Sequence, residues 1–456
     1  MNVLFMMSDE LSWWALGHAG GVADTPNLDR LAARSMRFDA AYTPSPICVP
    51  TRAAIATGRD VHEIGCWSSA EPYYGQVPSW GHAVQASGQT CVSIGKLHYR
   101  SVQDDVGFDE QIEPVHVVDG VGWVQALLRR PVEPDQNSHT LARDIGPGTS
   151  DYLDFDRRVT AETVAWLGAP ERQTAPWSAF VSWLCPHFPL IAPPEDFARY
   201  DAAPRPSEPV PDHPGVREMA DFFCHGAYFS DETRGIAWAS YQGMVTFLDR
   251  QVGQVLDALE AAGLAEDTLI LFTSDHGEML GEKGLWTKSV MYDSSARVPL
   301  LMAGPGVAPG VWRDPVSLID AAPTICGAMG AACDGFSGVD LRAPVRGREV
   351  ISQYHDGGAP NGFTMLRWQN WKLVYYAGGH AAQLFDMAAD PQELQDLAAL
   401  RADVLAEGMA RLHARFDPEA VNARAFADQA TRIAALGGAD AIRAREQFDY
   451  TPADSR

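Results

Sequence analysis

The sequence is poor in basic residues: 35 Lys and Arg stand against 59 Asp and Glu, and the formal net charge is −24. A nucleic-acid-binding protein needs a basic face to contact phosphates, so we expect no nucleic-acid partner. An anionic membrane surface would repel the chain for the same reason. If the protein acts on an anion, its few cations must be gathered in one place.

Three other features are missing: a long apolar run, a basic N-terminal region and paired cysteines. No segment is long and apolar enough for a membrane-spanning helix, and MNVLFMMSDE at the start resembles a strand rather than a signal peptide. The seven cysteines are odd in number and form no CxxC pair, which is typical of buried thiols rather than a disulfide framework. We therefore predict no membrane contact and a cytoplasmic location.

Apolar strand-like runs alternate with amphipathic helix-like segments over most of the chain. This alternation predicts an α/β fold with a large, mostly parallel sheet and helices on both faces. The expected strands are 2–8, 36–43, 90–96, 177–184, 267–278 and 297–306, and the expected helices are 25–35, 156–168, 239–263 and 317–330. The segments 135–155 and 200–235 are predicted to be long excursions from this core.

The pattern changes near residue 347. Short strands with turn signals at 348–354, 363–377 and 383–387 predict an antiparallel sheet, and a helix is expected over 392–416. We therefore predict a catalytic α/β domain over 1–346 and a smaller α+β domain with a helical tail over 347–456. The charged tail after Asp417 could contact another subunit in a homo-oligomer.

Acidic residues follow two of the predicted strands. Asp9 and Glu10 come directly after the first strand, and Asp275 and His276 follow the strand that begins near 267. Adjacent carboxylates repel each other, which favours a bound cation, although an aspartate after a strand is also a common helix cap. Ligands of parallel sheets lie at the carboxyl ends of strands, so these four side chains could hold one divalent metal ion.

Five cationic or imidazole side chains lie at or near predicted strand ends: Arg52, Lys96, His98, His187 and Lys288. Each alone is more often a surface charge or a capping group. Together, in a chain this acidic, they predict a pocket for an anion.

Cys48 lies two residues before Pro50, which suits the first turn of a helix. The helix dipole would favour a thiolate or an anion there. Three interpretations stay open on this ground: a small buried apolar residue, a thiolate nucleophile paired with His98 or His187, or a metal ligand.

The stretch CVPTR, from Cys48 to Arg52, continued to Thr57 and Gly58, resembles the signature of the formylglycine-dependent sulfatases of the alkaline phosphatase superfamily. Thr51 replaces the commoner serine or alanine of that signature. Further segments similar to sulfatase landmarks follow in family order: TPNLD (25–29), GKLH (95–98), PHFP (186–189), SDHGE (274–278), LWTK (285–288) and QLFDMAADPQELQDLA (383–398). The resemblance covers nearly the whole chain and implies an alkaline-phosphatase-like fold.

The resemblance implies that a formylglycine-generating enzyme converts Cys48 to an aldehyde. One hydroxyl of the hydrated aldehyde would attack sulfur and release the alcohol, and the second would lose its proton and expel sulfate. The ligands implied for one divalent metal are Asp9, Glu10, residue 48, Asp275 and His276. Ca²⁺ is the implied metal, with Mn²⁺ or Zn²⁺ as alternatives because His276 suits those ions. Glu10 departs from the Asp, Asn or Gln that is commoner there.

The other roles implied by the resemblance concern the cationic side chains. Arg52 would stabilise the hydrate, and Lys96 and Lys288 would neutralise sulfuryl oxygens. His98 would act as a base, and His187 would protonate or hydrogen-bond the leaving oxygen. The chain is therefore expected to be a sulfuric ester hydrolase that acts on a small organic sulfate ester.

Two alternatives remain. Phosphonate monoester hydrolases share the Cys48 motif, the Asp-His pair and a lysine twelve residues later, whereas Lys96 and His98 favour a sulfatase. The chain could also be a non-catalytic anion-binding protein with an unmodified Cys48. Aromatic residues at 12–17, 65–75 and 363–371 could line a pocket for an aryl or choline-like group or could belong to the core, and a sugar sulfate is not excluded.

Overall fold

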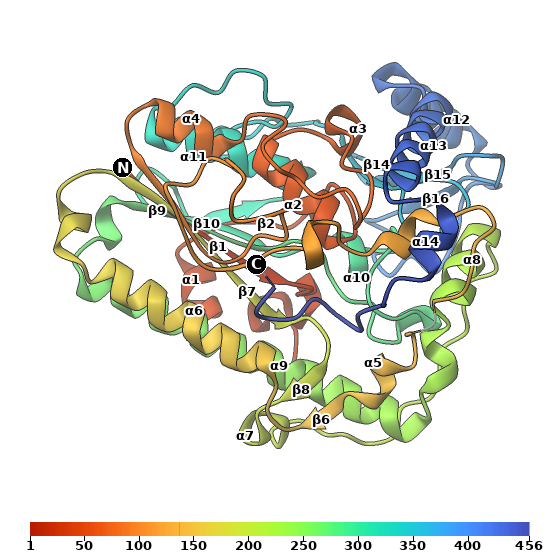
Figure 1. Ribbon diagram of the computed structural model, residues 1–456, viewed down its shortest axis with the longest axis horizontal. Coiled ribbons are helices and arrows are strands. Elements are labelled where there is room, and N and C mark those ends of the chain that lie inside the picture. The colour runs from red at the N-terminus through yellow and green to blue at the C-terminus, as the bar shows by residue number, and fades with distance from the viewer. Residues whose placement is uncertain (136, 456) are drawn as a thin grey trace.

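The computed structural model describes residues 1–135 and 137–455, and an eight-stranded sheet lies at its centre (Figure 1). From one edge to the other, the strands are β11 (Gly310–Trp312), β2 (Met36–Phe38), β10 (Leu300–Ala303), β9 (Thr268–Ser274), β1 (Asn2–Asp9), β7 (Trp177–Pro186), β4 (Thr90–Lys96) and β5 (Glu110–Val115). Two short pairs accompany it: β3 (Ala41–Tyr42) with β12 (Val316–Ser317), and β6 (Ile145–Pro147) with β8 (Leu190–Ala192).

The strands β9, β1, β7, β4 and β5 are all parallel, which confirms the mostly parallel sheet. The strand expected near 297–306 is β10, and it runs antiparallel to both β9 and β2. An antiparallel neighbour begins at the edge where the preceding strand ends, so no crossover is needed. The connection 275–299 therefore stays at the edge where the parallel strands end.

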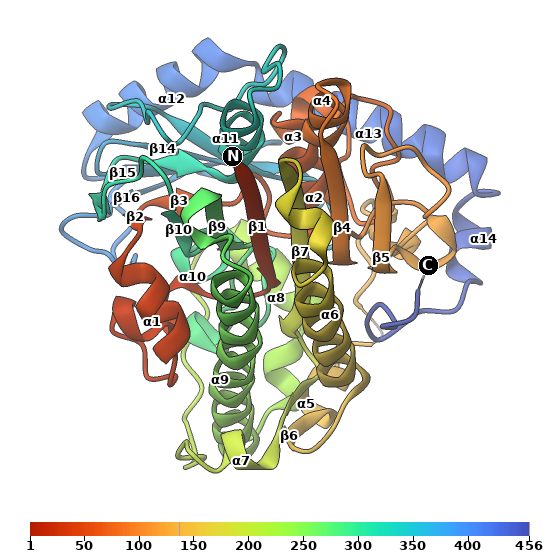
Figure 2. The ribbon, with the colours of Figure 1, turned by 90° about the vertical axis from the view of Figure 1, so that its left-hand side faces the viewer.

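Helices cover both faces of the sheet, as expected for a parallel sheet. Figure 2 shows α6 and α9 side by side on one face, while α4 and α11 lie on the other face in Figure 1. The first layer contains α1 (Pro26–Ala33), α6 (Asp151–Leu167) and α9 (Asp231–Ala261); the second contains α2 (Cys48–Thr57), α4 (Trp80–Ala86) and α11 (Ala321–Met329). The remaining short helices of this part are α3 (Val61–Ile64), α5 (Thr140–Arg143), α7 (Pro194–Phe197), α8 (Pro214–Phe223) and α10 (Asp293–Ala296).

The strand β1 is buried along its whole length because it packs against both layers. Leu4 and Met6 belong to the core beneath α6 and α9, whereas Phe5 and Met7 belong to the core that contains α2 and α11. This alternation explains why its sequence is a continuous apolar run.

Two long helices begin earlier than the sequence pattern indicates. The side chain of Ser150 caps α6 at the amide of Leu153, and that of Ser230 caps α9 at the amide of Thr233. Each cap adds a polar first turn that the apolar periodicity does not reveal. Part of each predicted excursion is therefore helical. No described helix has both the length and the apolar composition needed to cross a membrane.

The C-terminal part contains the expected antiparallel sheet. Its strands follow one another in order: β13 (Val350–Tyr354), β14 (Phe363–Trp368), β15 (Trp371–Tyr376) and β16 (Gln383–Asp386). The helix expected over 392–416 begins only at α12 (Ala402–Arg415). Asp396 explains the difference, because its side chain accepts hydrogen bonds from the amides of Leu384 and Ala398 and so competes with helical bonding.

The tail consists of α13 (Pro418–Ala435), α14 (Ala439–Arg443) and an irregular segment that ends near the centre of the view in Figure 1. It packs on its own chain, and an oligomer formed through it stays a prediction. One apolar cluster combines Tyr42 and Ile47 with Val350 and Tyr354, so the two predicted parts share a core. The domain boundary at 346/347 likewise stays a prediction.

Candidate active site

The ends of four parallel strands bring most of the predicted site residues together. β1 and β9 pair in register from Asn2 and Thr268 to Ser8 and Ser274, so Asp9 and Asp275 emerge side by side. Lys96 is the last residue of β4, and His187 directly follows β7. The edge of the sheet thus carries two carboxylates, an ammonium and an imidazole.

Cys48 is the first residue of α2, as predicted from Pro50, and Arg52 lies about one turn further along. The Cys48 Sγ lies 3.0 Å from Nε2 of His276 and 3.5 Å from Oδ1 of Asp9. Every residue of α2 is buried. The helix therefore presents its N-terminus to the strand ends rather than to solvent.

Four side chains form a group that could hold a metal ion. One ligand atom from each of Asp9, Cys48, Asp275 and His276 lies within 4.8 Å of all the others, and all four residues are buried. Two carboxylates and an imidazole form a donor set that suits a hard or borderline divalent cation. The residues present therefore fit the metal that the sequence implied.

Glu10 lies beside this group and forms, with Asp9 and His187, a second buried set of ligand atoms within 4.8 Å of one another that could hold a metal ion. Its Oε2 is 2.8 Å from Nζ of Lys288 and 3.3 Å from Nε2 of His187, while its buried Oε1 has no hydrogen-bond partner among the described residues. Burial raises the pKa of Glu10 well above its usual value despite the opposing charge of Lys288. Its predicted role as a metal ligand stays a prediction, and its position suggests a different role.

Arg52 and Lys96 neutralise the carboxylates. Arg52 Nε lies 2.8 Å from Oδ2 of Asp275, its Nη2 lies 3.4 Å from Oδ2 of Asp9, and its Nη1 donates to the carbonyl of Lys96. Lys96 Nζ also pairs with Asp9 and lies 3.9 Å from the Cys48 sulfur. Burial alone would raise the pKa of Asp9, but Lys96 and other nearby cations hold it well below its usual value. Asp9 is therefore ionised.

The surroundings of His98 and His187 favour the neutral form of each imidazole. Burial and the adjacent Lys288 lower the pKa of His187, and burial and Lys96 lower that of His98. His187 Nδ1 donates to the carbonyl of Phe188, so its Nε2 is free to accept from Lys288 Nζ at 2.8 Å. His98 Nε2 lies 2.8 Å from the hydroxyl of Thr451, a contact that the local sequence does not indicate.

The Cys48 thiol is not activated as a nucleophile. Burial and the carboxylate of Asp9 raise its pKa, and they outweigh the opposing charges of Lys96 and Lys288. This environment disfavours a thiolate. It therefore favours Cys48 as the precursor of formylglycine over Cys48 as a thiolate nucleophile.

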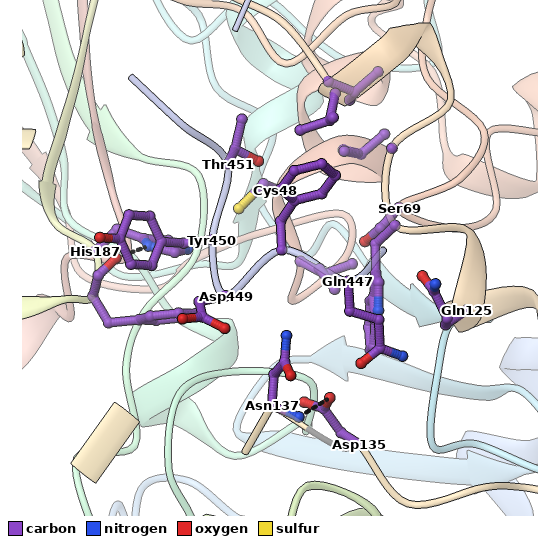
Figure 3. Close-up of a pocket in the computed structure, with 18 of the residues that line it drawn as sticks. Cys48, Ser69, Gln125, Asp135, Asn137, His187, Gln447, Asp449, Tyr450 and Thr451 are labelled. Atoms are coloured by element: carbon purple, nitrogen blue, oxygen red, sulfur yellow. Dashed lines mark hydrogen bonds between the residues drawn. The ribbon is translucent and has the colours of Figure 1, made fainter. Parts of the chain in front are cut away.

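A cavity of about 480 Å³ opens onto these residues. Its inner end contains Cys48, Lys96, His98, His187 and Lys288. Its outer wall carries acidic and aromatic residues, mostly from 117–125, 135–141, 223–225 and 445–451. Figure 3 shows Asp135, Asn137, Gln447, Asp449 and Tyr450 around the space next to Cys48.

The outer wall was not found from the sequence, because it is assembled from segments far apart in the chain. Of the aromatic stretches considered, 65–75 contributes only Ser69 to this cavity, and Trp67 and Trp368 are core residues. The rings that do line the cavity include Trp123, Phe223 and Tyr450.

Comparison with known proteins identifies the family. The family model described as Sulfatase matches residues 1–331, and that described as N-sulphoglucosamine sulphohydrolase, C-terminal, matches residues 281–419. The choline-sulfatase of Rhizobium meliloti (strain 1021) is 31% identical over 423 residues, which cover 87% of this chain and 82% of that protein. Human arylsulfatase K is 27% identical over 440 residues, covering 87% of this chain and 78% of that protein.

Solved structures share the fold at lower identity. The phosphonate monoester hydrolase from Silicibacter pomeroyi superposes with a TM-score of 0.72 at 23% identity, covering 91% of this chain and 96% of that chain. A 2-O GAG sulfatase has a TM-score of 0.70 at 21% identity, covering 100% of this chain and 97% of that chain. With the Sulfatase match spanning most of its length and the catalytic residue types gathered at one edge of its sheet, this chain belongs to the sulfatase family and is a sulfuric ester hydrolase.

Proposed function

We propose that this protein hydrolyses a small organic sulfate ester with formylglycine made from Cys48 and one divalent metal ion. The observation that carries the proposal is the packing of ligand atoms from Asp9, Cys48, Asp275 and His276 within 4.8 Å of one another. Lys96 and Lys288 line the same cavity, so an anionic group bound beside residue 48 would meet two ammonium groups.

The metal would be held by Asp9, Asp275, His276 and residue 48. When bound, it would supply Lewis-acid chemistry that polarises a sulfuryl oxygen. We favour Ca²⁺ because two of the four donors are carboxylates, and Mn²⁺ or Zn²⁺ are the alternatives that the imidazole permits.

The remaining side chains act on the ester itself. Lys96 and Lys288 neutralise sulfuryl oxygens as charge develops on them. In its protonated form, His187 is placed to pass the proton on Nε2 to the leaving oxygen, once Lys288 turns to the substrate. Arg52 keeps Asp9 and Asp275 in place through its paired contacts.

Maturation of Cys48 explains why a thiol with a raised pKa occupies this position. The hydrated aldehyde supplies a hydroxyl nucleophile and a second hydroxyl whose deprotonation releases sulfate. His98 is our candidate for the base, since its low pKa keeps it neutral near pH 7. A formylglycine-generating enzyme is the partner that this proposal requires.

The outer wall of the cavity favours a cationic leaving group. Asp119, Asp135, Glu446 and Asp449 line it beside Arg445, and the rings there include that of Trp123. Asp449 also pairs with Arg143, at 3.0 Å. Carboxylates and aromatic faces attract a quaternary ammonium, whereas an anionic sugar polymer would be repelled. The choline-sulfatase relative agrees with this interpretation, and we propose a choline-like sulfate ester as the preferred substrate.

The test is to weigh the tryptic peptide from Phe38 to Arg52, using protein made in a host able to form formylglycine. Formylglycine replaces sulfur by oxygen and removes two hydrogens, so the peptide is lighter than the encoded one. A peptide with the mass of unmodified cysteine would overturn the formylglycine mechanism. Turnover of choline sulfate, 4-nitrophenyl sulfate and a phenyl phosphonate monoester then ranks the three substrate classes.

A further inference from the structure

The end of the chain forms part of the cavity that contains Cys48. Residues 445–451 follow α14 and line the same space as Lys96. Figure 3 shows Gln447, Asp449, Tyr450 and Thr451 in this space together with His187. A terminal segment without regular secondary structure is poorly ordered unless specific contacts hold it. This tail segment, residues 445–455, is held by such contacts.

Three contacts anchor the tail segment to the catalytic part. The hydroxyl of Tyr152, a buried residue of α6, donates to the carbonyl of Thr451 at 2.7 Å. The rings of Tyr152 and Tyr450 meet edge to face, with their centroids 5.2 Å apart. The amide of His116 donates to the carbonyl of Ser455 at 2.8 Å. The backbone around Thr451 is therefore held both before this residue, at Tyr450, and after it, at Ser455.

The side chain of Thr451 reaches His98. Its Oγ1 lies 2.8 Å from Nε2 of the imidazole, and His98 is 8% exposed. The other ring nitrogen of His98, Nδ1, is buried and has no hydrogen-bond partner in the described part of the chain. Because a hydroxyl can donate or accept, this one bond orients the ring in either tautomer.

We propose that Thr451 is a positioning residue, whose hydroxyl holds the imidazole of His98 in the productive orientation while the tail segment closes the outer wall of the cavity. The proposal rests on the proposed function in one respect, the role of His98 in turnover. An imidazole that can rotate presents its basic nitrogen to the reacting group for only part of the time. Loss of the hydroxyl should therefore lower kcat more than it raises KM.

The experiment compares full-length Thr451→Val and Thr451→Ser with the unmutated protein, using 4-nitrophenyl sulfate. We expect Val to lower kcat about tenfold and to change KM by less than about threefold, and Ser to restore most of kcat. The control is Thr431→Val, since Thr431 is exposed on α13 and bonds only to the carbonyl of Ala427 among the described residues. A kcat for Thr451→Val within twofold of the unmutated protein would overturn the proposal, as would a Ser variant as slow as Val.

A measurement without turnover tests the docking of the tail segment separately. Limited tryptic digestion, followed by mass spectrometry, gives the rate at which cleavage after Arg445 releases the peptide 446–456. We expect slow release from the unmutated protein and an unchanged rate for Thr451→Val. Rapid release from the unmutated protein overturns the docked tail, even if no sulfate ester is turned over. If the Thr451→Val variant releases the peptide rapidly and the unmutated protein does not, the loss of kcat comes from undocking of the tail segment. That result would overturn the positioning role.

Discussion

The Nζ of Lys288 lies 2.8 Å from Oε2 of Glu10 and 2.8 Å from Nε2 of His187, so one buried ammonium joins a carboxylate and an imidazole. Burial alone would lower the pKa of Lys288, but Glu10 raises it above its usual value. Lys288 is therefore charged at neutral pH. A sulfate ester that binds here must compete with Glu10 for this ammonium.

Replacing Lys288 by Ala should lower kcat on sulfate esters by at least about a hundredfold, because the ammonium neutralises a sulfuryl oxygen in the transition state. Steady-state kinetics measures the loss, and circular dichroism and the thermal midpoint check that the fold is retained. A near-normal rate in a folded variant would remove Lys288 from the site.

Glu10 and Asp275 should differ in their effect on metal content. Asp275 belongs to the four-residue group that contains Cys48, whereas Glu10 belongs to a separate group with Asp9 and His187 and pairs with Lys288. Glu10→Gln should therefore retain bound metal after dialysis, and Asp275→Asn should lose most of it. Elemental analysis of the two variants beside the unmutated protein measures this. Equal losses would assign Glu10 to the metal as the family resemblance implies.

Asp135 should affect the choice of leaving group. It lines the outer wall, and its Oδ1 accepts from the amide of Asn137, an interaction that Asn can preserve. Asp135→Asn should raise KM for choline sulfate about tenfold, because it removes an attraction for the ammonium. KM for the neutral leaving group of 4-nitrophenyl sulfate should change by less than about twofold. Equal changes for both esters would argue against a cationic subsite.

His116 should contribute a loss of stability as the pH falls from about 6.5 to about 4. Burial lowers the pKa of His116 to about 4, from 6.5, so the unfolded chain binds a proton in this window that the folded chain does not. The stabilisation is present above pH 6.5 and is lost as the pH falls through the folded pKa.

His116 can be tested by a side-chain substitution, because it does not belong to the residues that line the cavity. Its Nε2 donates to Oε1 of Gln111 at 3.0 Å, a bond that the amide of a His116→Gln variant could replace. The variant should flatten the pH dependence of the free energy of unfolding between pH 4 and 6.5 by up to about 3 kcal/mol. Urea unfolding at several pH values measures the slope, and an unchanged slope would show that His116 does not contribute.

Much of the fold and of the inner site could be predicted from local sequence. Thr90–Lys96 was predicted with the bounds that the structure has, because a buried strand is a short apolar run that stops at a charge. The starts of α6 and α9 were placed too late, since Ser150 and Ser230 add polar first turns outside the apolar pattern. The direction of β10 depends on which strand it pairs with, and local periodicity does not report that.

The sequence by itself determined the residue types of the candidate active site and the edge of the sheet where they lie. Asp9, Lys96 and Asp275 end or follow strands, and Cys48 precedes a proline that starts a helix, so their chemistry is visible within a few residues. Only the tertiary structure decided the partners. It set Glu10 against Lys288 and brought Thr451 to His98, because hydrogen bonds between segments so far apart in the chain form only when the core has packed.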